Sequence, residues 1–138
     1  MKLLLDTNVI LDGYLPRLPF ANLALEVMML NENDKIKASI SASSVTDIYY
    51  FLQKRLKRKE AILIIEKILN EFEILPVGKG LLTVATQLPG DDFEDNLQIA
   101  CAISYKLDGI VTRDQSGFSH SSIPVFTPAQ LIAKLAIQ

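Results

Sequence analysis

The sequence has few of the side chains on which several classes of site depend. It contains one cysteine, Cys101, one histidine, His120, and no tryptophan. A single cysteine cannot form an internal disulfide, and it has no second thiol with which to build a zinc site. His120 likewise has no second histidine to form a metal pair, and we assign it no role. We therefore expect a reducing, cytoplasmic setting and a buried, inert thiol at Cys101.

Long apolar runs and a strong excess of either charge are also missing. No segment reaches the roughly 18 uncharged residues of a membrane span, and Asp6 ends the opening apolar run too early for a secretory signal. The net charge is -2 and the pI is near 5.4. This balance excludes a protein that coats nucleic acid with a basic surface, but it allows one that cleaves nucleic acid at a local site.

Apolar residues are abundant, at 49% of the chain, and the mean hydropathy is +0.25. Such a composition favours a sheet that is covered by helices on both faces. The 138 residues contain no internal repeat and no linker-like segment, so we expect a single domain over residues 1–138.

Hydrophobic periodicity and turn signals alternate along the chain between strand and helix. We expect strands at 2–5, 37–42, 73–77, 110–112 and 124–126, and helices at 21–30, 44–56, 60–72, 81–88, 92–107 and from Pro128 onward. In the first of these helices we expect Leu25, Met28 and Met29 to face the core. The alternation predicts an α/β fold, a three-layer α/β/α sandwich with a mainly parallel central sheet.

Four aspartates fall near one edge of this expected sheet. Asp6 and Asp114 follow strands, whereas Asp47 and Asp95 lie in the first turns of helices that begin near the same edge. Ligands of parallel α/β folds collect at the carboxyl ends of the strands. We therefore expect the four carboxylates to converge.

Each aspartate also has a purely local explanation. Asp47 completes a capping-box pattern with Ser44, and Asp92 can cap the helix that contains Asp95. Asp114 can be a turn residue, and Asp6 can cap a helix that starts near Val9. A carboxylate in a first helical turn is favourable in any case, because of the helix dipole.

Asp6 is the aspartate that a local explanation fits least well. The preceding Leu3, Leu4 and Leu5 are apolar on both faces of the strand, so Asp6 ends a buried, poorly hydrated strand. An isolated buried carboxylate is costly, and a divalent cation relieves both that cost and the repulsion between clustered carboxylates. Oxygen ligands without histidine or cysteine select Mg²⁺ or Mn²⁺, which suit hydrolysis of phosphodiesters.

Four stretches, LLLDTNVILD, SSVTDI, DDFEDNLQIACAI and IVTRD followed by SIPVFTPAQLI, occur in this order over essentially the whole chain. Together they resemble the PIN-domain ribonucleases, in particular the small VapC-type toxins. The resemblance implies that Asp6, Asp47, Asp95 and Asp114 are the acidic residues of a metal site, with Asp92 in reserve. It also implies an Mg²⁺- or Mn²⁺-dependent endoribonuclease that leaves a 5′-phosphate and a 3′-hydroxyl, an antitoxin partner and a homodimer.

Two positions depart from the family's pattern. Asp47 stands where the family often has glutamate, and Gly117 stands where a related subgroup commonly has a further aspartate. Asn8 and Thr112 match polar positions beside the site, where the resemblance implies that they position water or the scissile phosphate. Arg113, next to Thr112, is a candidate contact to the RNA backbone.

A basic run follows the helix that carries Asp47. Its charges are Lys54, Arg55, Lys57 and Arg58. They form either a solvated helix terminus or a cradle for RNA phosphates. Of the aromatic residues before the run, we expect Tyr49 and Phe51 in the core and Tyr50 at the surface, where it can stack on a base.

Two other functions compete with the nuclease. In a HAD-like phosphatase or phosphotransferase, Asp6 would be the nucleophile and the residue two positions later the general acid; that residue is Asn8, and an amide cannot serve as a general acid. The third possibility is a non-catalytic module of the same fold that binds a protein. Four clustered carboxylates without a metal would then be a cost to stability.

Overall fold

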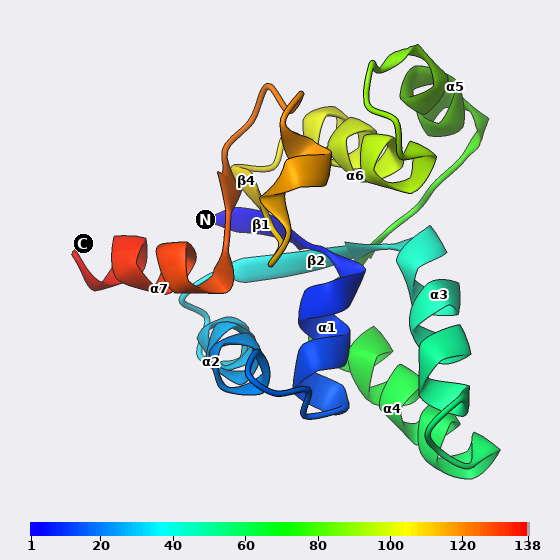
Figure 1. Ribbon diagram of the computed structural model, residues 1–138, viewed down its shortest axis with the longest axis vertical. Coiled ribbons are helices and arrows are strands. Elements are labelled where there is room, and N and C mark those ends of the chain that lie inside the picture. The colour runs from blue at the N-terminus through cyan, green and yellow to red at the C-terminus, as the bar shows by residue number, and fades with distance from the viewer. Residues whose placement is uncertain (138) are drawn as a thin grey trace.

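The computed structural model describes residues 1–137 and contains one sheet of five parallel strands (Figure 1). The strands are β1 (Lys2–Leu5), β2 (Lys37–Ser41), β3 (Glu73–Leu75), β4 (Gly109–Val111) and β5 (Val125–Phe126). Their order across the sheet is β3-β2-β1-β4-β5, so that β1 is central. All neighbouring strands run parallel, as the alternation of strand and helix predicts.

Helices cover both faces of this sheet (Figure 1). They are α1 (Thr7–Tyr14), α2 (Ala21–Glu32), α3 (Ala42–Gln53), α4 (Arg58–Glu71), α5 (Lys79–Gln87), α6 (Phe93–Ser104), the 3-10 helix η1 (Gln115–Phe118) and α7 (Pro128–Ala136). Helices α1 to α4 and α7 pack into one hydrophobic cluster, and α5, α6 and η1 into another. The predicted three-layer α/β/α sandwich is thus confirmed.

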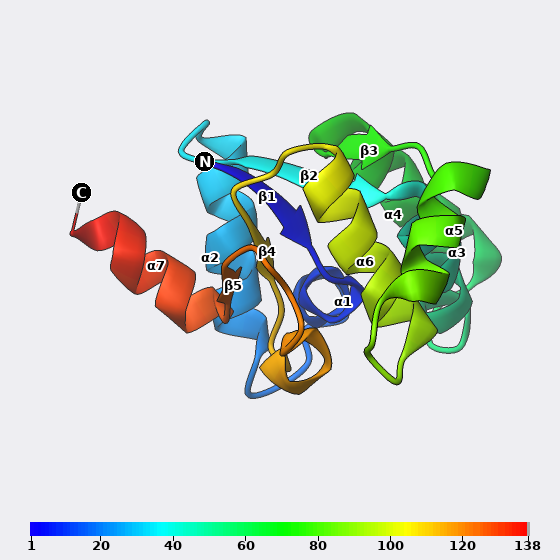
Figure 2. The same cartoon turned by 90° about the horizontal axis from the view of Figure 1, so that it is seen from above.

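The two hydrophobic clusters meet at β1. Leu3 and Leu5 belong to one cluster and Leu4 to the other, and all three side chains are fully buried. Successive side chains of a strand point to opposite faces, so an apolar strand between two helical layers has no exposed face. Figure 2 shows β1 running directly into α1 beside α6. The residue at this junction is Asp6, which therefore starts from a rigid, buried platform.

Helix α3 begins earlier than the sequence indicates. Its N-cap is Ser41, the last residue of β2, whose hydroxyl accepts a hydrogen bond from the Ser44 backbone N–H. The predicted Ser44–Asp47 capping box is therefore wrong, and Asp47 lies in the second turn of the helix. Because the helix follows the strand without a loop, Ser44 is drawn into the interior instead of capping.

Helix α2 turns a different face to the core from the one that its large residues suggest. Leu25 and Met29 are 43% and 56% exposed, whereas Ala21, Ala24 and Val27 are buried. The expectation that Leu25 and Met29 face inward is wrong. Small side chains let α2 approach α1 closely, and Met28 packs where a Cβ atom on Gly13 would lie.

None of the helices within residues 1–137 combines the length and the apolar character that crossing a membrane requires.

The orientation of α2 is tested by two alanine substitutions. Val27→Ala removes two methyl groups from a fully buried position and should lower the free energy of unfolding by about 2 kcal/mol. Met29→Ala changes an exposed side chain and should alter it by less than about 0.5 kcal/mol. Urea unfolding of both variants gives the comparison; a larger effect at Met29 would contradict the arrangement described here.

Candidate active site

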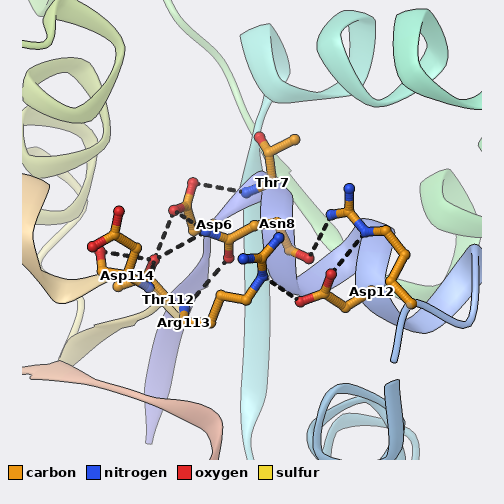
Figure 3. Close-up of polar contacts among 8 residues, drawn as sticks. Asp6, Thr7, Asn8, Asp12, Thr112, Arg113 and Asp114 are labelled. Carbon is orange, nitrogen blue, oxygen red and sulfur yellow. Dashed lines mark hydrogen bonds and ion pairs between the residues drawn. The ribbon is translucent and has the colours of Figure 1, made fainter. Parts of the chain in front are cut away.

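Asp6 lies between the end of β1 and the start of α1, and residues of α1 and of the segment after β4 fix its carboxylate (Figure 3). One oxygen, Oδ1, accepts the Thr7 backbone N–H at 2.8 Å and so caps α1. The other, Oδ2, accepts the Thr112 hydroxyl at 2.9 Å and the Asn8 side-chain amide at 3.3 Å. The local and the functional explanations of Asp6 are thus compatible, because the capping carboxylate also faces the residues after β4.

A chain of buried polar side chains contacts Asp6 from the interior of the protein. The amide nitrogen of Gln98 lies 3.5 Å from Asp6 Oδ1 and 3.1 Å from the Ser44 hydroxyl, and Ser44 contacts the Ser41 hydroxyl at 2.8 Å. Gln98 is only 2% exposed although it sits on the apolar face of α6. A buried amide needs hydrogen-bond partners, and here those partners tie α6 to β1 and α3.

Burial raises the pKa of the Asp6 carboxyl group, and the nearby charge of Asp114 raises it further. Hydrogen bonds from Thr112, Thr7 and Gln98 oppose this shift because they stabilise the ionised form. Asp6 is therefore a carboxylate that its neighbours hold in place in a poorly hydrated position.

Two acidic residues of α6 face Asp6 across a cleft. Burial and the charges of Asp92, Asp6 and Asp114 raise the pKa of Asp95 to about 6. The pKa of Glu94 rises to about 7 because of burial, a hydrogen bond with Asp47 and the surrounding negative charges. Burial is the main cause of both raised pKa values, and the neighbouring carboxylates add to it. Glu94 was not among the residues that the sequence singled out.

Asp114 and Asp92 mainly serve as caps. Asp114 is exposed, and its Oδ1 accepts the Ser116 hydroxyl at 2.6 Å and the Ser116 backbone N–H at 3.2 Å, which caps η1 and lowers its pKa. Its own backbone N–H donates to the Thr112 hydroxyl at 3.2 Å. Asp92 caps α6 by accepting the Asp95 backbone N–H at 3.0 Å.

Gly117 contacts the carboxylate of Asp95. A Cβ atom at residue 117 would overlap Asp95 Oδ2 and crowd its Cγ, so only glycine leaves Asp95 in its present position. The position at which a related subgroup carries aspartate is thus filled here by the side chain of Asp95 itself. Gly117 and Asp95 form a matched pair across η1 and α6.

Asp6, Glu94 and Asp95 line an open cleft of about 280 Å³, whereas Asp47, Asp92 and Asp114 are not among its lining residues. Its lining consists of Asp6, Thr7, Asn8, Leu11, Arg17, Phe51, Glu94, Asp95 and Arg113. Phe51, expected in the core, is 41% exposed and lies on this wall, because α3 presents Ile48 and Leu52 to the interior instead. Tyr49 packs partly against the core and Tyr50 is 52% exposed, as expected.

The basic run lies where α3 passes into α4, and its residues do not line the cleft. Lys57 is the N-cap of α4, and the ammonium group of Lys54 sits 4.2 Å from the centre of the Tyr50 ring. Lys54 thus reaches back along α3 toward the exposed aromatic residues. Arg55, Lys57 and Arg58 remain exposed.

The acidic donors suit a hard cation in their chemistry. Over residues 1–137, however, no three Asp, Glu, His or Cys side chains stand close enough together to hold a metal ion. Three buried oxygens in that range, Thr7 Oγ1, Asn96 Oδ1 and Gln98 Oε1, lack a hydrogen-bond partner there, and of these residues Thr7 lines the cleft. An all-oxygen donor set, mutually repelling carboxylates and unpartnered oxygens fit Mg²⁺ or Mn²⁺. Binding would require the carboxylates to close up from these positions.

The chain belongs to the PIN domain family, whose family model matches residues 2–116. Ribonuclease VapC1 of Aquifex aeolicus (strain VF5) is 31% identical over 126 residues, which cover 86% of this chain and 85% of that protein.

Solved structures share the fold at lower identity. FitAcB from Neisseria gonorrhoeae superposes with a TM-score of 0.71 at 22% identity, covering 92% of this chain and 98% of that one. VapBC2 from Rickettsia felis, bound to a DNA fragment from their promoter, gives 0.66 at 18% identity, with 91% and 97% covered.

The Gly117–Asp95 contact is tested by a double-mutant cycle. Gly117→Ala should lower the free energy of unfolding by about 1–3 kcal/mol because the new methyl group displaces the Asp95 carboxylate. In an Asp95→Ala background the same substitution should cost less than about 0.5 kcal/mol. The control is Gly80→Ala in α5, where an added Cβ atom meets nothing within 4 Å among residues 1–137 apart from its chain neighbours and its own helix backbone, and which should be neutral or stabilising. Equal costs of Gly117→Ala in both backgrounds would show that the contact does not exist.

Proposed function

We propose that this protein is an Mg²⁺- or Mn²⁺-dependent endoribonuclease. The observation that carries the proposal is the cleft in which Asp6, Glu94 and Asp95 face one another from two elements. Similarity to ribonuclease VapC1 supports RNA as the substrate. The acidic composition of the cleft supports a metal-dependent reaction, because a bare cluster of carboxylates would repel a phosphodiester.

In this proposal Asp6 and Asp95 hold the metal. Glu94, Asp47 and Asp114 are the further acidic residues around it, and Asp92 is a reserve ligand. When bound, the metal supplies an activated water and stabilises negative charge on the phosphate. Glu94, whose pKa is raised by the neighbouring Asp47, supplies the longer side chain whose absence at position 47 departs from the family's pattern. In this proposal α6 contributes two adjacent acidic residues to the site, Glu94 and Asp95, rather than Asp95 alone.

The neighbouring polar residues hold the carboxylate of Asp6 in one orientation. Thr112 and Thr7 each donate to one of its oxygens, so that the carboxylate cannot rotate freely. Asn8 donates to both Asp6 and Thr112, and its side-chain oxygen accepts the Arg113 backbone N–H at 3.4 Å. Ordering of ligands by such secondary contacts is what a metal site requires. Asn8 and Thr112 are therefore positioning residues for Asp6.

The position of Asn8 argues against a HAD-like phosphatase or phosphotransferase. Its amide donates to Asp6 and Thr112, and it has no group that can protonate a leaving oxygen. A non-catalytic module of the same fold predicts that the acidic residues can be neutralised without loss of function. The substitution of Asp6 described below separates that possibility from the nuclease.

An antitoxin protein and a second copy of the chain are the partners that we propose. The similarity to toxin-antitoxin structures supports the first. For the second, α5 and α6 flank an apolar groove of about 690 Å³, beside which Val84, Ile103 and Tyr105 are exposed. Exposed apolar surface of this kind is typical of protein interfaces.

Asp6→Asn should keep the fold and abolish cleavage of labelled single-stranded RNA in Mn²⁺. The amide fills the same space and still accepts the Thr7 N–H, but it removes the charge that the metal needs. Wild-type cleavage should stop on addition of a chelator and should leave 5′-phosphate ends. The matched control is Asp34→Asn, at an exposed turn that does not line the cleft, which should cleave at the wild-type rate.

Thermal unfolding of both variants shows whether a loss of activity reflects a loss of fold. Full activity of folded Asp6→Asn, or cleavage that persists in chelator, would refute the proposed function. An inactive wild-type protein that binds a protein partner would instead favour the non-catalytic module.

The basic run is tested by neutralising Lys54, Arg55, Lys57 and Arg58 to glutamine. If these side chains guide RNA toward the cleft, affinity should fall and the dependence of binding on salt should flatten by about 0.7 in log-log slope per lost phosphate contact. Fluorescence anisotropy at several salt concentrations measures both quantities. An unchanged affinity and slope would show that these residues do not bind RNA and are solvated side chains at a helix junction.

A further inference from the structure

Asp12 is a buried carboxylate in the middle of α1 that holds two arginines. It is 1% exposed, and its two oxygens accept one hydrogen bond each, from Arg17 Nε and Arg113 Nε, both at 2.8 Å (Figure 3). Arg17 follows α1, whereas Arg113 follows β4 and is 101 residues away from Asp12 in the chain. The carboxylate thus joins two distant segments at one wall of the cleft.

The charges in this cluster do not balance. One arginine would neutralise Asp12, and the second leaves a surplus positive charge beside an acidic cleft. A buried ion pair is weak as a stabilising device, since apolar residues of the same size do as well or better. Stabilisation of the fold therefore does not explain why Asp12 holds two arginines in this arrangement.

Both guanidinium groups are fixed through Nε, which leaves their terminal nitrogens available. Within residues 1–137 these nitrogens make one hydrogen bond, a long one of 3.5 Å from Arg17 Nη2 to the Asn8 carbonyl. Both side chains are about 30% exposed, at 29% and 32%, and both line the cleft with Asp6 and Asp95. The Arg113 guanidinium also lies 4.3 Å from the centre of the Phe20 ring, which restricts its movement further.

We propose that Arg17 and Arg113, oriented by Asp12, form a binding site for a backbone phosphate of the RNA. Planar guanidinium groups bind phosphate through paired N–H donors, and prior orientation reduces the entropy lost on binding. Phe51, exposed on the wall of the same cleft, offers a surface on which a base stacks. A phosphate site beside an aromatic surface favours a nucleic-acid strand over the carboxylates of a peptide. This proposal rests on the proposed function.

The test measures RNA binding in an Asp6→Asn background with chelator, so that cleavage does not enter the readout. The probe is a short, fluorescently labelled single-stranded RNA. Arg17→Gln and Arg113→Gln should each weaken binding about tenfold and reduce the log-log salt slope by about 0.7. Arg17→Lys keeps the charge but not the planar fork, and should lose affinity with the slope retained. Asp12→Asn keeps both arginines but frees them, and should weaken binding several-fold.

Lys79→Gln is the matched control, because it removes one exposed positive charge from α5 outside the cleft and should leave both quantities unchanged. Thermal unfolding confirms that each variant is folded. Wild-type affinity and slope in the folded Arg17→Gln and Arg113→Gln variants would overturn the phosphate site, and the proposed function would stand if wild-type protein still cleaves RNA. Unchanged RNA binding with weakened binding of an acidic peptide would overturn it in favour of a protein contact. Absence of RNA binding and cleavage by wild-type protein would remove both proposals together.

Discussion

The partial burial of Asp6 at the end of the central strand is the constraint on which the rest of the structure depends. Three fully buried leucines bring the chain to this point, and the carboxylate there is costly unless its surroundings compensate it. Thr7, Thr112 and Gln98 supply that compensation from three different elements. The hydrogen bonds that stabilise the ionised form of Asp6 also fix the orientation of its carboxylate. The central sheet and the acidic cleft are therefore consequences of the same arrangement.

Much of the architecture follows from the periodicity of the sequence. The five strands, their parallel order and the covering helices were expected from the alternation of apolar runs and turn signals, and they are confirmed. Errors occur where a tertiary contact overrides a local preference. Helix α2 buries Ala24 and Val27 rather than Leu25 because Gly13 permits a close approach to α1, and no pattern within α2 contains that information. Likewise Ser41, not Ser44, caps α3, because the helix follows its strand directly.

The sequence predicted part of the candidate site. Asp6 and Asp95 were expected at one edge of the sheet, and both line the cleft. Glu94 was passed over beside Asp95, although both stand in the first turn of α6. Gln98, the one polar residue in the apolar run that follows Asp95, was a usable signal, because a buried amide needs a partner. Of the arginine cluster, Arg113 was expected as a contact to the RNA backbone, but its pairing with Arg17 through Asp12 had no such signal, since Asp12 and Arg113 are distant in the chain and Arg17 resembles an ordinary loop residue.

Our central proposal is that Asp6, which follows β1, and Asp95, on α6, form a single site for a hard cation. Calorimetric titration of the protein with Mn²⁺ tests it without reference to any substrate. We expect that wild-type protein binds Mn²⁺, that folded Asp6→Asn and Asp95→Asn each lose this binding, and that Asp34→Asn retains it. Equal binding of Mn²⁺ by wild-type protein and both site variants would contradict the claim.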